Sequence, residues 1–158
     1  MFTMQTTART ELNVRLREMR FSTDLAAVMA IERRVFECPW TLAEFDRADD
    51  RRIVAVTGGE VVGYMVLENH AGYTELANLA VNPDFRRRGV GRRLLGLLRN
   101  QAIVWATVRE TNLDAQLFFR AAGFKARNVL RDHYADISES GYRFCYRQPI
   151  LNLGRIQS

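Results

Sequence analysis

The feature that most constrains this chain is a turn rich in glycine and arginine, placed between two apolar segments. The segment 76–81 before the turn has the composition of a buried strand, and the leucines in 94–98 after it recur at helical spacing. A strand that runs through such a turn into a helix presents unpaired backbone N–H groups at the positive end of the helix dipole. Gly89 and Gly91 keep side chains off the main chain and permit φ > 0. The turn therefore predicts a main-chain site for a phosphate-bearing ligand.

Two common nucleotide motifs are excluded by the residues around this turn. A P-loop requires Lys followed by Ser or Thr after its last glycine, and Arg92 and Arg93 occupy those positions. A dinucleotide fingerprint requires a third glycine where this chain has Leu94. The pattern that remains is R-x-x-G-x-G over 86–91, directly after a strand.

Length and composition predict one soluble domain. A chain of 158 residues with 47% apolar and 26% charged residues can bury a full core, and no apolar run reaches the ~20 residues that span a bilayer. We expect the domain to cover 14–150, with a loose leader at 1–13 and a tail at 151–158. The leader lacks the pattern of a secretory signal, so we expect a cytoplasmic protein without a membrane partner.

Neither metal nor nucleic acid is predicted as a ligand. Cys38 and Cys145 are far apart, and only His70 and His133 accompany them, so no metal site is expected. The net charge of +5 comes almost entirely from arginine, since Lys125 is the single lysine. No interleaving of aromatic and basic residues indicates a surface for stacking bases, so direct nucleic-acid binding is not expected.

Hydrophobic periodicity and turn residues predict a mixed α/β domain without internal repeats. Ser22 or Thr23 is predicted to cap the first helix, Thr41 and Glu44 form a capping box for the second, and Asn112 caps the fourth. The expected order is a strand over 14–19, a helix to about 36, a short helix after 41, strands at 53–56, 61–67 and 73–81, a helix after the glycine turn, a strand at 103–108, a helix from 113 to about 122, and strands at 126–131 and 142–148.

The glycine turn and this order of elements resemble the GNAT superfamily of N-acetyltransferases over about 15–147. The resemblance implies a central, mostly antiparallel, twisted sheet of six to seven strands flanked by about four helices. Three stretches are similar to the ribosomal-protein-alanine N-acetyltransferases and related N-terminal acetyltransferases within that superfamily: 31–41 ending in Pro-Trp-Thr, 79–85, and 108–112 together with Ala-Gly-Phe at 122–124.

Acetyl-CoA is the cofactor that the resemblance implies. Backbone N–H groups of the turn would hold its pyrophosphate, and the strand before the turn would lie along its pantetheine arm. Asn112 matches a cofactor-contacting asparagine of the family, although a simple helix cap looks the same in sequence. The implied cofactor-binding residues are Leu79, Ala80, Val81, Arg86, Arg87, Arg88, Gly89, Val90, Gly91, Arg92, Asn112 and Phe119.

The chain departs from this group at its two proton-transfer positions. Thr107 stands where the group has a glutamate, and Phe119 stands where it has a tyrosine. Neither side chain exchanges protons at neutral pH, so those two roles are not carried over. We expect Glu75, acting through a water, to serve as the base, because in an ideal strand it shares a face with Leu79 and Val81. The alternative for Glu75 is a solvated carboxylate at a strand end.

The acceptor side is predicted from aromatic residues. Phe36, Glu37 and Trp40 would form one wall of the acceptor groove, and Tyr134 the other. Such a slot suits a peptide α-amine, whose pKa of about 8 leaves part of it neutral. The alternatives are that Phe36 and Trp40 belong to the core and that Tyr134 is a surface loop residue.

The sequence therefore predicts an N-acetyltransferase that acts on the amino terminus of a peptide or protein. A small-molecule amine is the second acceptor class, since one fold serves many acceptors. Because of Thr107 and Phe119, a weakly catalytic acyl-CoA-binding module stays open as a third interpretation. We expect a monomer or a homodimer.

Overall fold

The computed structural model of the protein describes residues 12–47, 49–134 and 138–149. The predicted tail at 151–158 and residues 1–11 of the predicted leader lie outside the described residues. Leu12, which falls within that leader, packs against the core. The elements are β1 (Arg15–Glu18), α1 (Phe21–Val35), α2 (Leu42–Phe45), β2 (Arg51–Thr57), β3 (Glu60–His70), β4 (Tyr73–Val81), the 3-10 turn η1 (Pro83–Phe85), α3 (Val90–Gly96), η2 (Leu97–Asn100), β5 (Ile103–Arg109), α4 (Leu113–Ala121), β6 (Lys125–Tyr134) and β7 (Glu139–Arg147).

Within the described residues, one sheet of seven strands runs in the order β1-β2-β3-β4-β5-β7-β6. Every neighbouring pair is antiparallel except β4 and β5, which are parallel. This sheet and its four α-helices confirm the predicted fold class.

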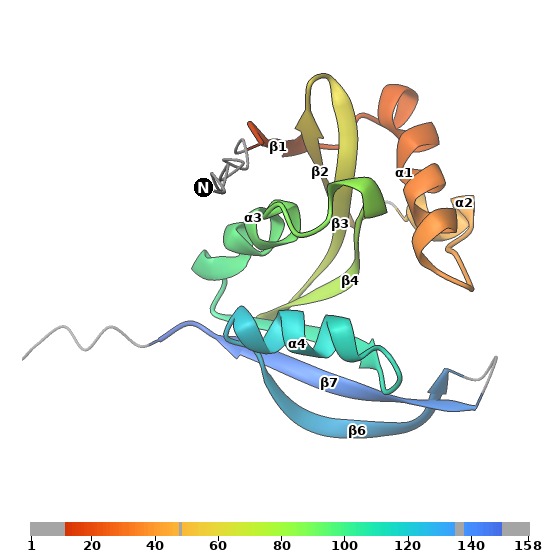
Figure 1. Cartoon of the computed structure of the whole chain (residues 1–158). Coiled ribbons are helices and arrows are strands. Elements are labelled where there is room, and N and C mark those ends of the chain that lie inside the picture. The colour runs from red at the N-terminus through yellow and green to blue at the C-terminus, as the bar shows by residue number, and fades with distance from the viewer. Residues whose placement is uncertain (1–11, 48, 135–137, 150–158) are drawn as a thin grey trace, which may run out of the picture.

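β4 and β5 are paired only near their starts. The parallel pairing extends from Thr74 opposite Val104 to Leu76 opposite Ala106. Beyond that point the two strands diverge (Figure 1). In the part of the chain that the structure describes, 77–81 of β4 has no strand partner on the β5 side. The divergence leaves main-chain N–H and C=O groups available at an open strand edge.

A β-bulge interrupts the pairing of β3 with β4. Val66 lies opposite Asn78, but the next residue, Leu67, lies opposite Leu76. Ala77 is therefore an additional residue in β4, which reverses the alternation of side chains between the two faces.

The bulge changes the face to which Glu75 belongs. Leu76 and Leu79 both lie in the core cluster that includes α3 and α4, although they are three residues apart. Glu75 precedes Leu76 and so faces the opposite side of the sheet. The expectation that Glu75 shares a face with Leu79 and Val81 is wrong, because it assumed an unbulged strand.

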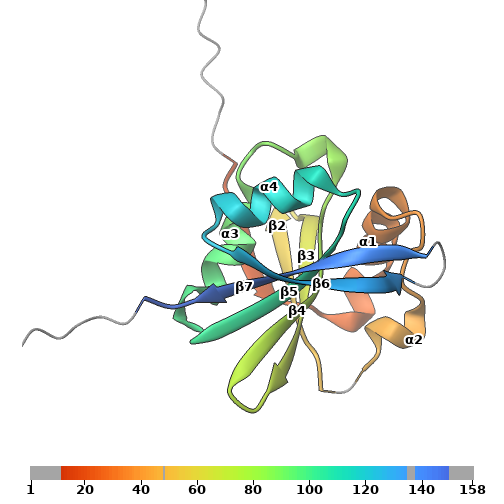
Figure 2. The same cartoon turned by 90° about the horizontal axis from the view of Figure 1, so that it is seen from below.

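The helices cover the two faces of the sheet in pairs. Leu94 of α3 and Phe119 of α4 pack on one face, while Val28 of α1 and Phe45 of α2 pack on the other. Seen from below, α3 and α4 lie together and apart from α1 and α2 (Figure 2). Gly63 of β3 allows the close approach of α3, since a Cβ there would lie 3.2 Å from the Cγ1 atom of Val90.

Most of the predicted helix ends are confirmed. Thr41 and Glu44 form both bonds of the capping box, and Asn112 accepts a hydrogen bond from the amide of Ala115. The cap predicted at Ser22 or Thr23 is wrong: α1 begins at Phe21 and its N-cap is Arg20. Asp24 instead folds back and accepts a hydrogen bond from the Arg20 amide at 2.7 Å. The capping side chain therefore lies inside the helix rather than ahead of it.

Asp24 makes the stability of the fold sensitive to acid. Arg17 donates two hydrogen bonds to its carboxylate, at 2.6 and 2.9 Å, and lowers the pKa of Asp24 from 3.8 to about 2. Because the folded pKa is depressed, this stabilisation is complete above pH ~4 and is lost as the pH falls towards 2. We expect Asp24→Asn to lower the free energy of unfolding at pH 7 by about 2 kcal/mol. Urea unfolding at pH 7, 5 and 3 measures it; an equal loss at every pH would contradict the linkage.

No helix in the described ranges is long and apolar enough to cross a membrane.

Candidate functional site

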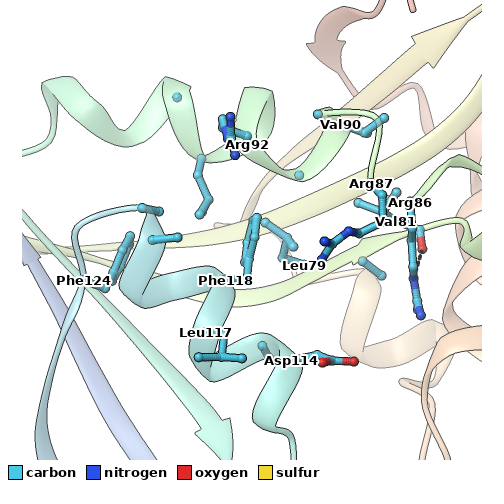
Figure 3. A pocket seen from close by; sticks show the side chains of 18 of the residues that line it. Leu79, Val81, Arg86, Arg87, Val90, Arg92, Asp114, Leu117, Phe118 and Phe124 are labelled. Carbon is cyan, nitrogen blue, oxygen red and sulfur yellow. Dashed lines mark hydrogen bonds between the residues drawn. The ribbon is translucent and has the colours of Figure 1, made fainter. Parts of the chain in front are cut away.

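A cavity of about 980 Å³ opens where β4 and β5 diverge. Its walls are the end of β4, the glycine turn with the first turn of α3, and one side of α4 (Figure 3). Val35 and Phe36, at the end of α1, lie at its margin. Segments that are far apart in the sequence thus meet at the end of β4, whose main chain has no strand partner on the β5 side.

The backbone of the glycine turn is free to bind. In the described structure, the amide N–H groups of 87–92 donate to no protein acceptor, and the first helical bond runs from the Arg93 amide to the Gly89 carbonyl. Arg87 and Gly89 both have positive φ, at 61° and 82°. Such alternation turns successive N–H groups towards one side and forms a concave site for an anion.

The cavity contains most of the predicted cofactor-binding residues but not all of them. The lining includes Leu79, Ala80, Val81, Arg86, Arg87, Gly89, Val90, Gly91, Arg92 and Asn112. Arg88 is exposed outside the lining, with its guanidinium 5.9 Å from the Phe85 ring centroid. Phe119 lies in the core, where its ring stacks on Phe144 and meets Phe124 edge-to-face. Neither of these two predicted cofactor-binding residues lines the cavity.

Phe118 takes the place expected for Phe119. Its ring lines the cavity opposite α3, and a Cβ on Gly91 would lie 3.0 Å from its Cζ atom (Figure 3). Sequence alone did not separate these two adjacent phenylalanines, since both belong to an apolar helix face. Only the register of α4 against the sheet decides which of them faces the cavity.

The end of α1 is tied to the segment before the glycine turn. Arg34 donates two hydrogen bonds to the Asp84 carboxylate, both at 2.9 Å, and one to Asn82 at 2.8 Å. These bonds lower the pKa of Asp84, which is exposed. The pair therefore ties the end of α1 to the segment before the turn.

Glu75 lies on the far face of the sheet from α4, in a charged cluster. Arg143 of β7 donates to both of its carboxylate oxygens, at 2.8 and 3.3 Å, and reaches the Thr107 hydroxyl at 3.5 Å. The Arg143 guanidinium also lies 4.8 Å from the Trp105 ring centroid. The structure thus brings Glu75 and Thr107 together through Arg143, which the sequence analysis did not identify. In the sequence, Arg143 stands out only as an arginine inside an otherwise apolar strand pattern.

A buried carboxylate holds the loop between α1 and α2. Glu32 is 1% exposed and accepts hydrogen bonds from the Tyr64 hydroxyl, from Asn78 at 3.2 Å and from the Trp40 amide at 2.7 Å. Burial, together with the Glu32 charge, raises the pKa of Tyr64, so its hydroxyl stays protonated and donating. The sequence analysis did not identify Glu32. Its carboxylate fixes the Pro-Trp segment by accepting a hydrogen bond from the main-chain amide of Trp40.

The predicted acceptor walls differ in how far they are buried. Phe36 and Trp40 are half-buried against the core cluster that includes α1, so they are partly core as the alternative predicted. Trp40 also packs edge-to-face on Phe45, with 5.3 Å between ring centroids. Glu37 is exposed and does not line the cavity.

Tyr134 is held at the end of β6 by Arg109, whose guanidinium lies 4.0 Å from the tyrosine ring centroid. Glu139 accepts hydrogen bonds from the Thr111 hydroxyl at 2.5 Å, the Thr111 amide at 3.0 Å and Arg109 at 3.0 Å. These bonds lower the pKa of Glu139. Tyr134 is therefore positioned by a cation–π contact rather than lying loose in a surface loop.

Comparison with known families agrees with a turn of free amides beside an open strand edge and a cavity. The acetyltransferase (GNAT) family matches residues 16–124. The chain belongs to the GNAT family. It is accordingly an acetyl-CoA-dependent N-acetyltransferase, the activity that this family and its named relatives share.

Two comparisons relate this GNAT enzyme to a ribosomal-protein acetyltransferase. It is 30% identical over 122 residues to the [ribosomal protein bS18]-alanine N-acetyltransferase of Escherichia coli K12, over 72% of this chain and 82% of that protein. The crystal structure of the ribosomal-protein-S18-alanine N-acetyltransferase from Escherichia coli superposes with a TM-score of 0.75 at 25% identity, covering 92% and 99% of the two chains. The fold matches along nearly the whole length.

A further structural match belongs to an enzyme with a different name. Nourseothricin acetyltransferase superposes with a TM-score of 0.70 at 21% identity, covering 86% of this chain and 99% of that one. This likeness shows the fold alone. It illustrates that the GNAT fold does not specify the acceptor.

The residues present at the cavity fit acetyl-CoA. The unpaired amides and the arginines of the turn suit a pyrophosphate, and the open edge of β4 suits an amide-bearing arm. Among the described residues, no group of three His, Cys, Asp or Glu side chains is arranged to hold a metal ion.

Proposed function

We propose that this GNAT enzyme transfers the acetyl group of acetyl-CoA to the α-amine of a peptide or protein amino terminus. The observation that carries the proposal is the divergence of β4 from β5 beside a turn with free amides. The similarity to the bS18-alanine N-acetyltransferase supports the acceptor class. Bound acetyl-CoA supplies a thioester, which an amine attacks to release a thiolate.

The chain's own residues would act in three ways. Amides of 87–92 hold the pyrophosphate, with Arg86, Arg87 and Arg92 adding positive potential. The free edge of β4 at Leu79–Val81 pairs with the pantetheine arm, and one amide there donates to the thioester oxygen, a contribution of about 3–4 kcal/mol for a fixed donor. Asn112 caps α4 and lies in the cavity wall, so we assign it a cofactor contact as well.

Glu75 is the proposed base. It lies on the acceptor face beside Thr107, and a water between its carboxylate and the amine would relay the proton. Arg143 holds the carboxylate in place. Phe119 has no proton to give, so in this proposal the thiolate leaves unprotonated, which its ordinary pKa of about 8.5 makes feasible near neutral pH. Phe36, Trp40 and Tyr134 form the acceptor walls, and exposed Glu37 lies at the rim of the groove.

Release of free thiol from acetyl-CoA tests the proposal. Peptides with a free amino terminus, the same peptides with a formylated terminus, and a set of small amines are assayed in parallel. We expect thiol release with free peptides and none with blocked ones. Turnover with small amines alone would assign the enzyme to the second acceptor class. Acetyl-CoA binding without thiol release would identify a binding module.

A further inference from the structure

Within the described residues, the part of the sheet formed by β5, β7 and β6 has no packed helix on the face opposite α4, beside the proposed acceptor site. On β5 and β7, the core-facing residues Val104, Ala106 and Phe144 alternate with residues of the other face, such as Trp105 and Arg143. In the described ranges, α1 packs on β3 and β4, and the core cluster that includes α4 lies on the opposite face. Viewed from below, β6 and β7 lie in front with no helix over them (Figure 2).

This open face carries an excess of positive charge. A concavity of about 740 Å³ at its far end is lined by Lys125, Arg127 and Arg147, and no carboxylate contributes to the lining. In the described structure, none of these three side chains makes an ion pair with the protein. Glu75, an acid on this face, is already paired with Arg143. The face therefore attracts anionic groups.

The concavity lies within reach of a chain whose amine is at the acceptor site. Thr107 lies opposite Arg143, and Ile103 lies opposite Arg147, along the same pair of strands. Arg147 lies four positions after Arg143 along β7, which corresponds to about 13 Å. An extended peptide with its first residue beside Thr107 would place its fourth to sixth residues over the concavity.

We propose that the acceptor is a polypeptide with an acidic segment at about positions 4–6, which docks on the open face at Lys125, Arg127 and Arg147. The inference rests on the proposed function and adds the charge of the acceptor to it. Nucleic acid fits this face less well. Its one tryptophan, Trp105, is covered on one side by the Arg143 guanidinium, and single-stranded nucleic acid binds to aromatic rings that are open for stacking.

A charge-exchange experiment tests the proposal. Three peptides share residues 1–3 and carry Asp/Glu, Asn/Gln or Lys at positions 4–6. They are assayed for kcat/KM with the wild-type chain and with Lys125→Glu/Arg147→Glu. Arg120→Glu, which places the same type of charge reversal on exposed α4, is the control. A single-stranded RNA oligomer is added as a competitor in a separate series.

We expect the wild-type enzyme to prefer the acidic peptide to the neutral one by about tenfold in kcat/KM, as two to three exposed charge pairs allow. The preference should appear in KM, weaken at high salt and reverse in the double variant but not in Arg120→Glu. Equal use of all three peptides would overturn the acidic-acceptor inference and leave the acetyltransferase proposal intact. Turnover of no peptide would overturn both. Inhibition by RNA together with indifference to peptide charge would assign the face to nucleic acid instead.

Discussion

Gly91→Glu is expected to abolish acetyl-CoA binding. Gly91 lies in the first turn of α3 among the free amides, and a Cβ there already meets Phe118 at 3.0 Å. A glutamate adds a carboxylate where the pyrophosphate would lie. We expect the dissociation constant to rise by more than about a hundredfold, because opposed like charges cost several kcal/mol. Isothermal titration calorimetry measures it.

A matched variant separates this effect from a general disturbance. Leu97→Glu introduces the same charge at the end of α3, where the side chain is 43% exposed and outside the cavity lining. It should bind acetyl-CoA like the wild type. The melting temperature of each unliganded variant shows whether the fold is kept. Unchanged affinity in a folded Gly91→Glu protein would refute main-chain binding of the pyrophosphate.

Glu75→Gln is expected to lower kcat by at least about tenfold, within the range that a general base supplies. The amide keeps the size of the side chain and one acceptor for Arg143, but it takes no proton. Acetyl-CoA affinity should hardly change, because Glu75 and the cavity lie on opposite faces of the sheet. Pre-steady-state thiol release and calorimetry give the two quantities independently.

Glu110→Gln is the matched control for Glu75→Gln. Glu110 is an exposed carboxylate in the turn after β5, close in sequence to Thr107. Neutralising it should leave kcat unchanged. If Glu75→Gln kept full turnover, Glu75 would have only the structural role of pairing with Arg143. A loss confined to Glu110→Gln would move the base to the other carboxylate.

The conformation of the glycine turn was predictable from sequence because its requirements are local. Gly89 has φ 82°, a conformation that favours glycine, and the following leucines bury one helix face. The capping box at Thr41 and the cap at Asn112 are equally local. The resemblance to the GNAT superfamily then indicated the order of strands and helices in which the turn and the two helix caps occur.

The parts that sequence could not predict depend on register. Ala77 carries no mark of a bulge, yet it decides which face Glu75 occupies. Phe118 and Phe119 differ only in their angle around α4. Arg143 meets Glu75 across 68 residues of sequence, through β5. Each of these results from how distant strands and helices align, which no short motif encodes.

The short parallel seam between β4 and β5 has a mechanical consequence. Its three residue pairs are the direct main-chain connection between the β1–β4 half and the β5–β7–β6 half of the described sheet. A molecule lodged between Leu79 on one side and Phe118 on the other would brace both halves at once. Binding of a ligand in the cavity should then slow amide hydrogen exchange at the three β4–β5 pairs, as well as at the residues that the ligand touches.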